Sequence, residues 1–164
     1  MPDLAGPALV LAELLKAHHE TLAVAESSTG GLISASLLAV PGASAYYLGG
    51  TVIYTIKARN ELLGLSKETL KAQSPLTEAY VTLCARAIRE KLGATWGIAE
   101  LGATGPAGTS YGHPPGICVL AVEGPVTLTA RIDNGCGDRE ANMWEFAHTA
   151  LQLLQRALQS RASL

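Results

Sequence analysis

The stretch that decides the fold is Leu22-Ala23-Val24-Ala25-Glu26-Ser27-Ser28-Thr29-Gly30-Gly31, which joins a short apolar run to a helix-forming run that begins at Leu32. A strand that turns directly into a helix brings its last side chains and the free N–H groups of the helix to one place. A serine hydroxyl there can attack a carbonyl while the N–H groups hold the developing oxyanion, and the same N–H groups can instead hold a phosphate. A plain βα turn, with a Ser/Thr N-cap and two glycines for clearance, has the same composition. The stretch therefore predicts a strand followed by a helix and leaves these three uses of the turn open.

Outside this stretch, helical and strand patterns alternate along the chain. Apolar spacing, N-caps and glycine stops predict helices over 4–19, 31–40, 57–63, 66–72, 77–92 and 138–158, and strands over 21–25, 51–54, 94–101, 117–122 and 126–132. Helices interleaved with strands predict a layered α/β domain with helices on both faces of the sheet. The turn Glu123-Gly124-Pro125 is typical of a hairpin, so the sheet is expected to be mixed rather than purely parallel.

Composition narrows the class of protein. The 164 residues suit one domain, taken as 1–164, and the 48% of apolar residues suffice for a full core. A net charge of −2 argues against broad nucleic-acid binding, which needs a basic surface. Three widely spaced cysteines indicate neither a zinc site nor a disulfide framework. The absence of a signal peptide or of a long apolar run predicts a cytoplasmic protein without membrane contact.

Two further loops carry chemistry-bearing residues directly after a strand. Tyr54 ends the second strand, and Lys57 and Arg59 open the next helix, where a phenol and a cation can relay protons or bind phosphate. Two solvated cations beside a strand-end tyrosine are the plainer interpretation. Thr104 and Gly105 lie in a glycine-rich loop after the third strand, where the backbone can approach a ligand closely. We expect all three loops to leave the same edge of the sheet, where ligands bind in such folds.

These segments, taken together and in this order, resemble the CinA C-terminal domain family, the nicotinamide-nucleotide amidases. The resemblance covers roughly residues 5–158. It is carried by Ala25 to Gly31, Pro41-Gly42-Ala43-Ser44, Gly50 with Val52 and Tyr54, Leu63-Gly64, Gly102 with Thr104-Gly105-Pro106, Pro114 with Gly116, and Gly137-Asp138-Arg139. It implies a three-layer α/β/α sandwich with a mixed, mostly parallel sheet, and a homo-oligomer. It also implies hydrolysis of the carboxamide of nicotinamide mononucleotide to nicotinate mononucleotide and ammonia, without metal or cofactor.

The resemblance also implies roles for individual residues. Ser27 is the expected nucleophile and Tyr54 its partner in proton transfer. The N–H groups around Thr29, Gly30 and Gly31 are expected to contact the oxyanion or the phosphate. The remaining substrate contacts are expected at Gly50 and in the loop of Thr104 and Gly105, which would close over the nucleotide.

The chain departs from the family pattern at the position of the base. The family usually has a lysine five residues after the tyrosine, and this chain has Arg59 there. Arginine keeps its proton at neutral pH and is a poor proton acceptor. Lys57 lies two positions earlier, which on a helix turns it by about 200° from position 59. Ser28 stands where the family usually has a cysteine. Three hypotheses therefore remain: an amidase whose base is Tyr54, Lys57 or another group, a nucleotide-binding module in which Arg59 holds phosphate and catalysis is weak or lost, and a hydrolase that acts on another amide.

Overall fold

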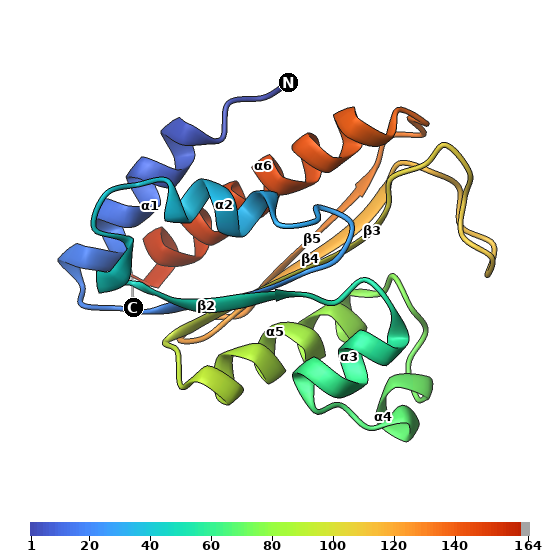
Figure 1. Cartoon of the computed structure of the whole chain (residues 1–164), viewed down its shortest axis with the longest axis horizontal. Helices are drawn as coiled ribbons and strands as arrows, with labels where there is room; N and C mark the ends of the chain where they lie inside the picture. Colours follow the sequence, from blue (N-terminus) through green and yellow to red (C-terminus); the bar gives the residue numbers. More distant parts are fainter. Residues whose placement is uncertain (162–164) are drawn as a thin grey trace.

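The computed structural model describes residues 1–161 and consists of one sheet with helices on both sides (Figure 1). In chain order the elements are α1 (Ala5–Ala17), β1 (Leu22–Glu26), α2 (Leu32–Leu38), the 3-10 turn η1 (Ala43–Ala45), β2 (Tyr47–Val52), α3 (Ile56–Leu63), α4 (Lys67–Lys71), α5 (Glu78–Leu92), β3 (Trp96–Ala103), β4 (Ile117–Glu123), β5 (Leu128–Asp133) and α6 (Arg139–Arg161). The predicted order of helices and strands is confirmed. β2 begins and ends earlier than the predicted strand over 51–54, because its two glycines are accommodated within the strand.

The strands lie in the order β2-β1-β3-β4-β5. β1 pairs in parallel with β2 and β3, whereas β3–β4 and β4–β5 are antiparallel. The sheet is mixed and mostly parallel in strand direction, as expected, since only β4 runs against the other four strands. β4 is antiparallel to β3 because the glycine-rich segment 104–116 returns the chain to the same edge of the sheet without a crossover helix.

The two faces of the sheet carry separate hydrophobic layers. α1, α2 and α6 cover one face, and α3, α4 and α5 lie on the other (Figure 1). Alternate residues of a strand point to opposite faces, so Val24 packs with the first group and Ala23 and Ala25 pack with the second. This arrangement confirms the α/β/α sandwich.

Caps predicted from the sequence set several helix boundaries. The hydroxyl of Thr77 accepts a hydrogen bond from the Tyr80 N–H at the start of α5, and Gly93 ends that helix in the left-handed conformation. Asp138 caps α6, since its Oδ1 accepts from the Ala141 N–H at 3.1 Å. Short polar side chains at N-caps satisfy N–H groups that have no partner within the helix. These boundaries place the loops that follow the strands.

The carboxyl ends of β1, β2 and β3 lie at one edge of the sheet, because these three strands run in the same direction. The residues that follow them are Ser27, Ile53 and Thr104. The predicted meeting of three loops at one edge is therefore confirmed. The loop after β3 extends beyond the sheet, as seen at the right of Figure 1.

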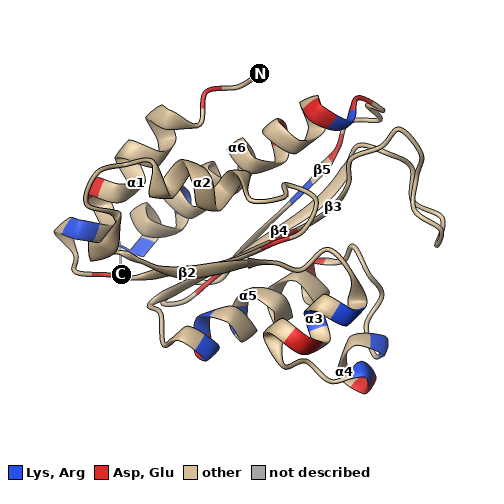
Figure 2. Ribbon diagram, in the orientation of Figure 1, with Lys and Arg blue, Asp and Glu red and all other residues tan. Residues whose placement is uncertain are grey.

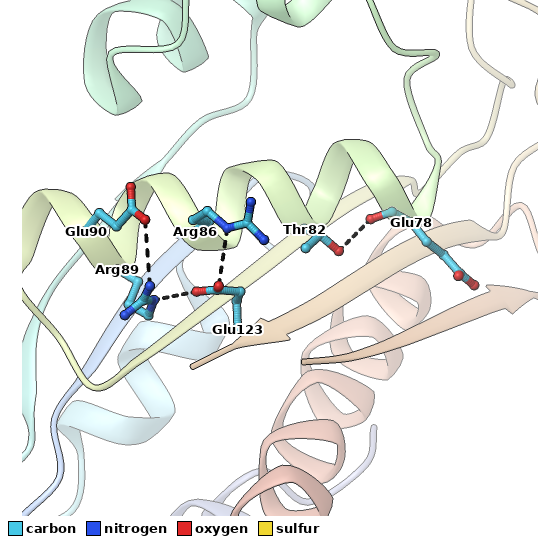
Figure 3. A network of polar contacts seen from close by, with 6 residues as sticks. All are labelled: Glu78, Thr82, Arg86, Arg89, Glu90 and Glu123. Carbon is cyan, nitrogen blue, oxygen red and sulfur yellow. Dashed lines mark hydrogen bonds and ion pairs between the residues drawn. The ribbon is translucent and has the colours of Figure 1, made fainter. Parts of the chain in front are cut away.

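The opposite edge is held by ion pairs between α5 and β4 (Figure 3). Glu123 is buried, and its carboxylate contacts Arg86 Nε at 3.2 Å and Arg89 Nε. Arg89 also reaches Glu90 at 3.7 Å. Two guanidinium groups compensate one buried carboxylate, so this cluster joins helix and strand.

The charged residues are spread over both helical layers (Figure 2). Within residues 1–161, no helix combines the length and the apolar character that crossing a membrane requires.

Candidate active site

A cavity of about 420 Å³ lies at the edge where β1, β2 and β3 end. Cavities of about 300–1,000 Å³ are typical of small-molecule sites. Side chains and backbone from the three predicted loops and from the start of α6 line it, among them Ser27, Tyr54, Arg59, Thr104, Gly105, Tyr111 and Arg139. The structure thus brings Ser27, Tyr54, Arg59, Thr104 and Gly105 together, as the sequence predicts.

Ser27 is one of the residues that line this cavity. It is 4% exposed, and its backbone N–H donates to Glu100 Oε2 at 2.9 Å. Its side chain lines the cavity, and its hydroxyl has no hydrogen-bond partner among residues 1–161. A hydroxyl that lines a cavity and has no protein partner is free to bond a ligand.

Glu100, which was not predicted as a site residue, holds the turn that carries Ser27. It is fully buried on β3. Besides the Ser27 N–H, its carboxyl group contacts the Thr29 N–H at 3.0 Å, the Thr29 hydroxyl at 2.9 Å and the Ser28 hydroxyl. The signal was present, because Glu100 is the only charged residue of the strand 96–103. A carboxylate inside a buried strand needs hydrogen-bond donors, which other segments must supply.

Glu100 is expected to make stability depend on pH. Burial raises its pKa above the ordinary value of 4.5, although the hydrogen bonds from Ser28, Thr29 and Ser27 act in the opposite direction. The protonated form is thus favoured in the folded state. This stabilisation is fully present below pH 4.5 and is lost as the pH rises through the higher pKa of the folded state.

Compared with Glu100→Gln, the unmodified chain should therefore lose free energy of unfolding as the pH rises above 4.5. Urea unfolding of both proteins from pH 4 to pH 8 measures this difference. A difference that is constant over the range would show that Glu100 does not change its charge on folding in this way.

The N–H groups of Thr29, Gly30 and Gly31 are not available to a ligand, which corrects the prediction for these three residues. Thr29 N–H donates to Glu100, Gly30 N–H to the Ser27 carbonyl at 3.2 Å, and Gly31 N–H to Glu26 at 2.9 Å. Internal acceptors occupy these groups because two fully buried acidic residues, Glu26 and Glu100, face the turn, and the turn itself closes onto the Ser27 carbonyl.

Glu26 acts as a side-chain cap for α2. Its carboxylate also accepts from the N–H groups of Ile33 at 3.1 Å and Ser34 at 3.0 Å. A carboxylate is favoured at a helix N-terminus by the helix dipole. The positive end of this helix is therefore already compensated within the protein.

Arg59 is buried and faces the cavity without an acidic partner among the described residues. Its Nε donates to the Ile53 carbonyl at 3.2 Å and its Nη1 to the Tyr80 hydroxyl at 3.2 Å, while its guanidinium lies 5.5 Å from the centre of the Tyr80 ring. Neutral acceptors orient the guanidinium but leave its charge uncompensated. Such a group favours an anion in the cavity.

Arg139 supplies a second guanidinium from the first turn of α6. Its Nη1 donates to the Gly105 carbonyl at 2.7 Å and its Nη2 to the Tyr54 hydroxyl at 3.3 Å. No acidic residue lines the cavity within the described part of the chain. The cavity thus combines two cations, a free serine hydroxyl and an exposed phenol.

Lys57 and Gly50 lie outside this cavity, which corrects two further predictions. Lys57 is exposed and lines a separate surface hollow with Asn60 and Glu61, because it projects from a different side of α3 than Arg59. Gly50 makes room for neighbouring side chains. A Cβ there would lie 2.4 Å from the Tyr47 hydroxyl and 2.9 Å from Ser34 Oγ.

The loop of Thr104 and Gly105 is fastened to α6. The buried Asn142 donates to the carbonyls of Thr104 at 2.9 Å and Cys136 at 2.7 Å. Gly105 has a φ of 100°, and a Cβ there would lie 2.8 Å from the Gly137 carbonyl oxygen. Asn142 was not predicted as a site residue, because its one signal in the sequence is an amide on the apolar side of the last helix.

Tyr111 also lines the cavity, from the extension of the same loop. Two hydrogen bonds between Thr109 and His113 close the turn that carries Tyr111. The Thr109 N–H donates to the His113 carbonyl at 2.8 Å, and the His113 N–H donates to the Thr109 hydroxyl at 3.0 Å. Burial raises the pKa of Tyr111, and Arg59 opposes the shift. The phenol therefore remains protonated at neutral pH.

Comparison with known proteins shows similarity over almost the whole chain. A putative competence-damage inducible protein of Moorella thermoacetica is 36% identical over 152 residues, which cover 93% of this chain and 37% of the relative. A CinA-like protein of Prochlorococcus marinus is 41% identical over 118 residues, which cover 72% of this chain and 28% of the relative. The chain therefore spans about a third of the length of these curated relatives.

Solved structures show the same fold. A competence-damaged protein (CinA) superfamily protein of Klebsiella pneumoniae has a TM-score of 0.89 and 30% identity, covering 97% of this chain and 99% of that one. A competence/damage inducible protein of Agrobacterium tumefaciens has a TM-score of 0.88 and 28% identity, with 97% of both chains covered. The model of the CinA C-terminal domain matches residues 6–158. The chain, whose motifs already resembled this group, thus belongs to the CinA C-terminal domain family.

Proposed function

We propose that this protein is an amidohydrolase that converts nicotinamide mononucleotide and water to nicotinate mononucleotide and ammonia, with Ser27 as the nucleophile. The observation that supports this most is the unpartnered Ser27 hydroxyl in a cavity that also holds Tyr54, Arg59 and Arg139. Amidase activity of the CinA C-terminal domain family agrees with this chemistry.

In this proposal, Ser27 Oγ attacks the carbonyl carbon of the carboxamide. The serine proton passes to Tyr54 Oη as the Tyr54 proton moves to the amide nitrogen, which leaves as ammonia. Tyr54 can donate because its oxygen already accepts a hydrogen bond from Arg139. Water then attacks the acyl-enzyme by the reverse proton path and releases the nicotinate product and the free serine.

The two guanidinium groups are proposed to bind the phosphate of the nucleotide. Arg59 is buried and has no acidic partner within residues 1–161, so a phosphate in the cavity would compensate its charge. Charge-assisted hydrogen bonds from arginine to phosphate are among the stronger polar contacts in proteins.

Ammonia release tests this proposal directly. The protein is incubated with nicotinamide mononucleotide, and with nicotinamide riboside, which lacks the phosphate. We expect ammonia and nicotinate mononucleotide from the first compound and much slower release from the second. Binding of the mononucleotide in calorimetry without any ammonia would contradict the amidase proposal.

Such a result would support a second function, a nucleotide-binding module. One observation favours it. Among the described residues, both cations that line the cavity are arginines, and no lysine, histidine or carboxylate lines it to accept the serine proton. The module keeps the fold and the phosphate contacts, while turnover is weak or lost.

The variant Arg59→Lys distinguishes two possible roles of position 59, phosphate binding and acceptance of the serine proton. If the protein is an amidase, lysine can lose its proton at this buried place and act as the base, so kcat for ammonia release should stay the same or rise, while KM should rise because a neutral lysine no longer compensates the phosphate. Steady-state kinetics on nicotinamide mononucleotide measures this change. Arg86→Lys, which makes the same substitution at the opposite edge of the sheet, is the control. A collapse of kcat in Arg59→Lys alone would show that the arginine has a role in the chemical step beyond phosphate binding.

A further inference from the structure

We propose that Glu100 is a positioning residue for the Ser27 nucleophile, an inference that rests on the proposed function. Glu100 lies on β3 beneath the turn and does not line the cavity. Its carboxyl group contacts donors of three consecutive residues, Ser27, Ser28 and Thr29.

The contacts of Glu100 place it behind the nucleophile and not in the reaction. Its oxygen at 2.9 Å from Ser27 accepts from the backbone N–H, whereas the Ser27 hydroxyl faces the cavity. The Ser28 hydroxyl points away from the cavity to the other oxygen of Glu100. The turn is thus bound to the sheet from below, and the direction of the Ser27 side chain follows from that attachment.

The glycine at position 102 leaves room for this arrangement. A Cβ at Gly102 would lie 2.6 Å from Ser28 Oγ and 2.8 Å from a ring carbon of Phe146. The Ser28 hydroxyl therefore sits between β3 and α6 only because position 102 has no side chain. Ser28 itself replaces the cysteine that is usual in the family, and a hydroxyl is a stronger hydrogen-bond donor to Glu100 than a thiol.

Removing the carboxyl group would leave the turn unattached. In Glu100→Ala, the N–H groups of Ser27 and Thr29 lose their acceptor within a buried environment. Such groups gain by moving toward water, and this movement carries the nucleophile with it. A displacement of about 1 Å can cost about 100-fold in rate.

Glutamine at position 100 can preserve the attachment. Its carbonyl oxygen can accept from the N–H groups of Ser27 and Thr29, as Glu100 Oε2 does. Its amide group then faces the Ser28 hydroxyl, which can turn and accept instead of donate. A positioning role therefore predicts that glutamine restores what alanine removes.

The test compares Glu100→Ala, Glu100→Gln and the unmodified protein in ammonia release from nicotinamide mononucleotide. We expect kcat to fall by about 10- to 100-fold in Glu100→Ala, with KM nearly unchanged. In Glu100→Gln, kcat should be close to that of the unmodified protein. Glu123→Ala is the matched control, because it removes another buried carboxylate at the opposite edge of the sheet (Figure 3). It should lower stability without changing kcat of the folded protein.

Amide hydrogen exchange gives a second readout that needs no activity. In Glu100→Ala, the Ser27 and Thr29 amides should exchange at least about tenfold faster than in the unmodified protein. In Glu100→Gln and in the Glu123→Ala control, these two amides should stay protected. If Glu100→Ala does not fold, Ser28→Ala removes one contact and should produce the same two effects by smaller factors.

Three results would overturn the proposal. Glu100→Ala with unchanged kcat and exchange would show that the turn holds without the carboxyl group. Faster exchange with unchanged kcat would show a role in structure alone. Loss of kcat in the glutamine variant equal to that in the alanine variant would assign Glu100 to proton transfer. If the unmodified protein releases no ammonia, the proposed function fails, and the exchange experiment still decides whether Glu100 holds the turn.

Discussion

Replacing Ser27 by alanine is expected to lower ammonia release from nicotinamide mononucleotide by at least about 1,000-fold, because the covalent route is lost with the nucleophile. The hydroxyl points into the cavity and makes no internal hydrogen bond in the described structure, so its loss should leave stability almost unchanged. Binding of the nucleotide should also persist, since Arg59 and Arg139 remain. Enzymatic detection of ammonia and calorimetric titration measure the two properties separately.

The matched control for this variant is Ser36→Ala. Ser36 lies on α2 outside the cavity, and its hydroxyl donates to the Ile33 carbonyl at 2.8 Å. Ser36→Ala should therefore release ammonia at the unmodified rate. Residual activity of Ser27→Ala within a factor of about ten of the unmodified protein would show that Ser27 is not the nucleophile.

Replacing Gly97 by alanine is expected to cost about 3 kcal/mol of the free energy of unfolding, the largest effect on stability that we predict. Gly97 lies on β3 directly beneath α5. A Cβ there would lie 2.2 Å from the Ala85 carbonyl oxygen and 2.7 Å from Arg89 Cβ. A backbone atom cannot rotate away, so the whole helix must move from the sheet. Urea unfolding at constant pH measures the loss.

Gly49→Ala is the control for Gly97→Ala, because both glycines lie within strands. A Cβ at position 49 would meet only Leu92 Cδ1, at 3.1 Å, and the end of a leucine side chain can move. This variant should change the free energy of unfolding by less than about 1 kcal/mol. Equal unfolding midpoints for the two variants would show that α5 does not approach β3 as closely as described.

Much of the fold could be predicted because its signals are local. The spacing of apolar residues, the cap at Thr77 and the stop at Gly93 depend on neighbours within one or two helical turns. The meeting of Ser27, Tyr54 and Thr104 could be predicted as well, since parallel strands end at the same edge of a sheet. The direction of β4 could not, because a glycine-rich loop of this length gives no direction to the strand that follows.

Within the site, the errors share one cause. The N–H groups of Thr29 and Gly31 look available in the sequence, where nothing shows that Glu100 and Glu26 occupy them. Lys57 and Arg59 are two residues apart, yet only Arg59 turns toward the cavity. In each case, whether a group is free for a ligand depends on which residues lie near it in space, and the sequence does not show these neighbours.

The sequence by itself determined the order of the helices and strands, the loops that carry the candidate chemistry and the family of the chain, because these follow from short-range preferences and from motifs read along the chain. The tertiary structure alone decided which groups remain free for a ligand. Ser27 and Glu100 are 73 positions apart and meet only because β1 and β3 are neighbours in the sheet. Hydrogen-bond donors that a buried carboxylate has taken are no longer available to a substrate, and that competition is settled by distance in space.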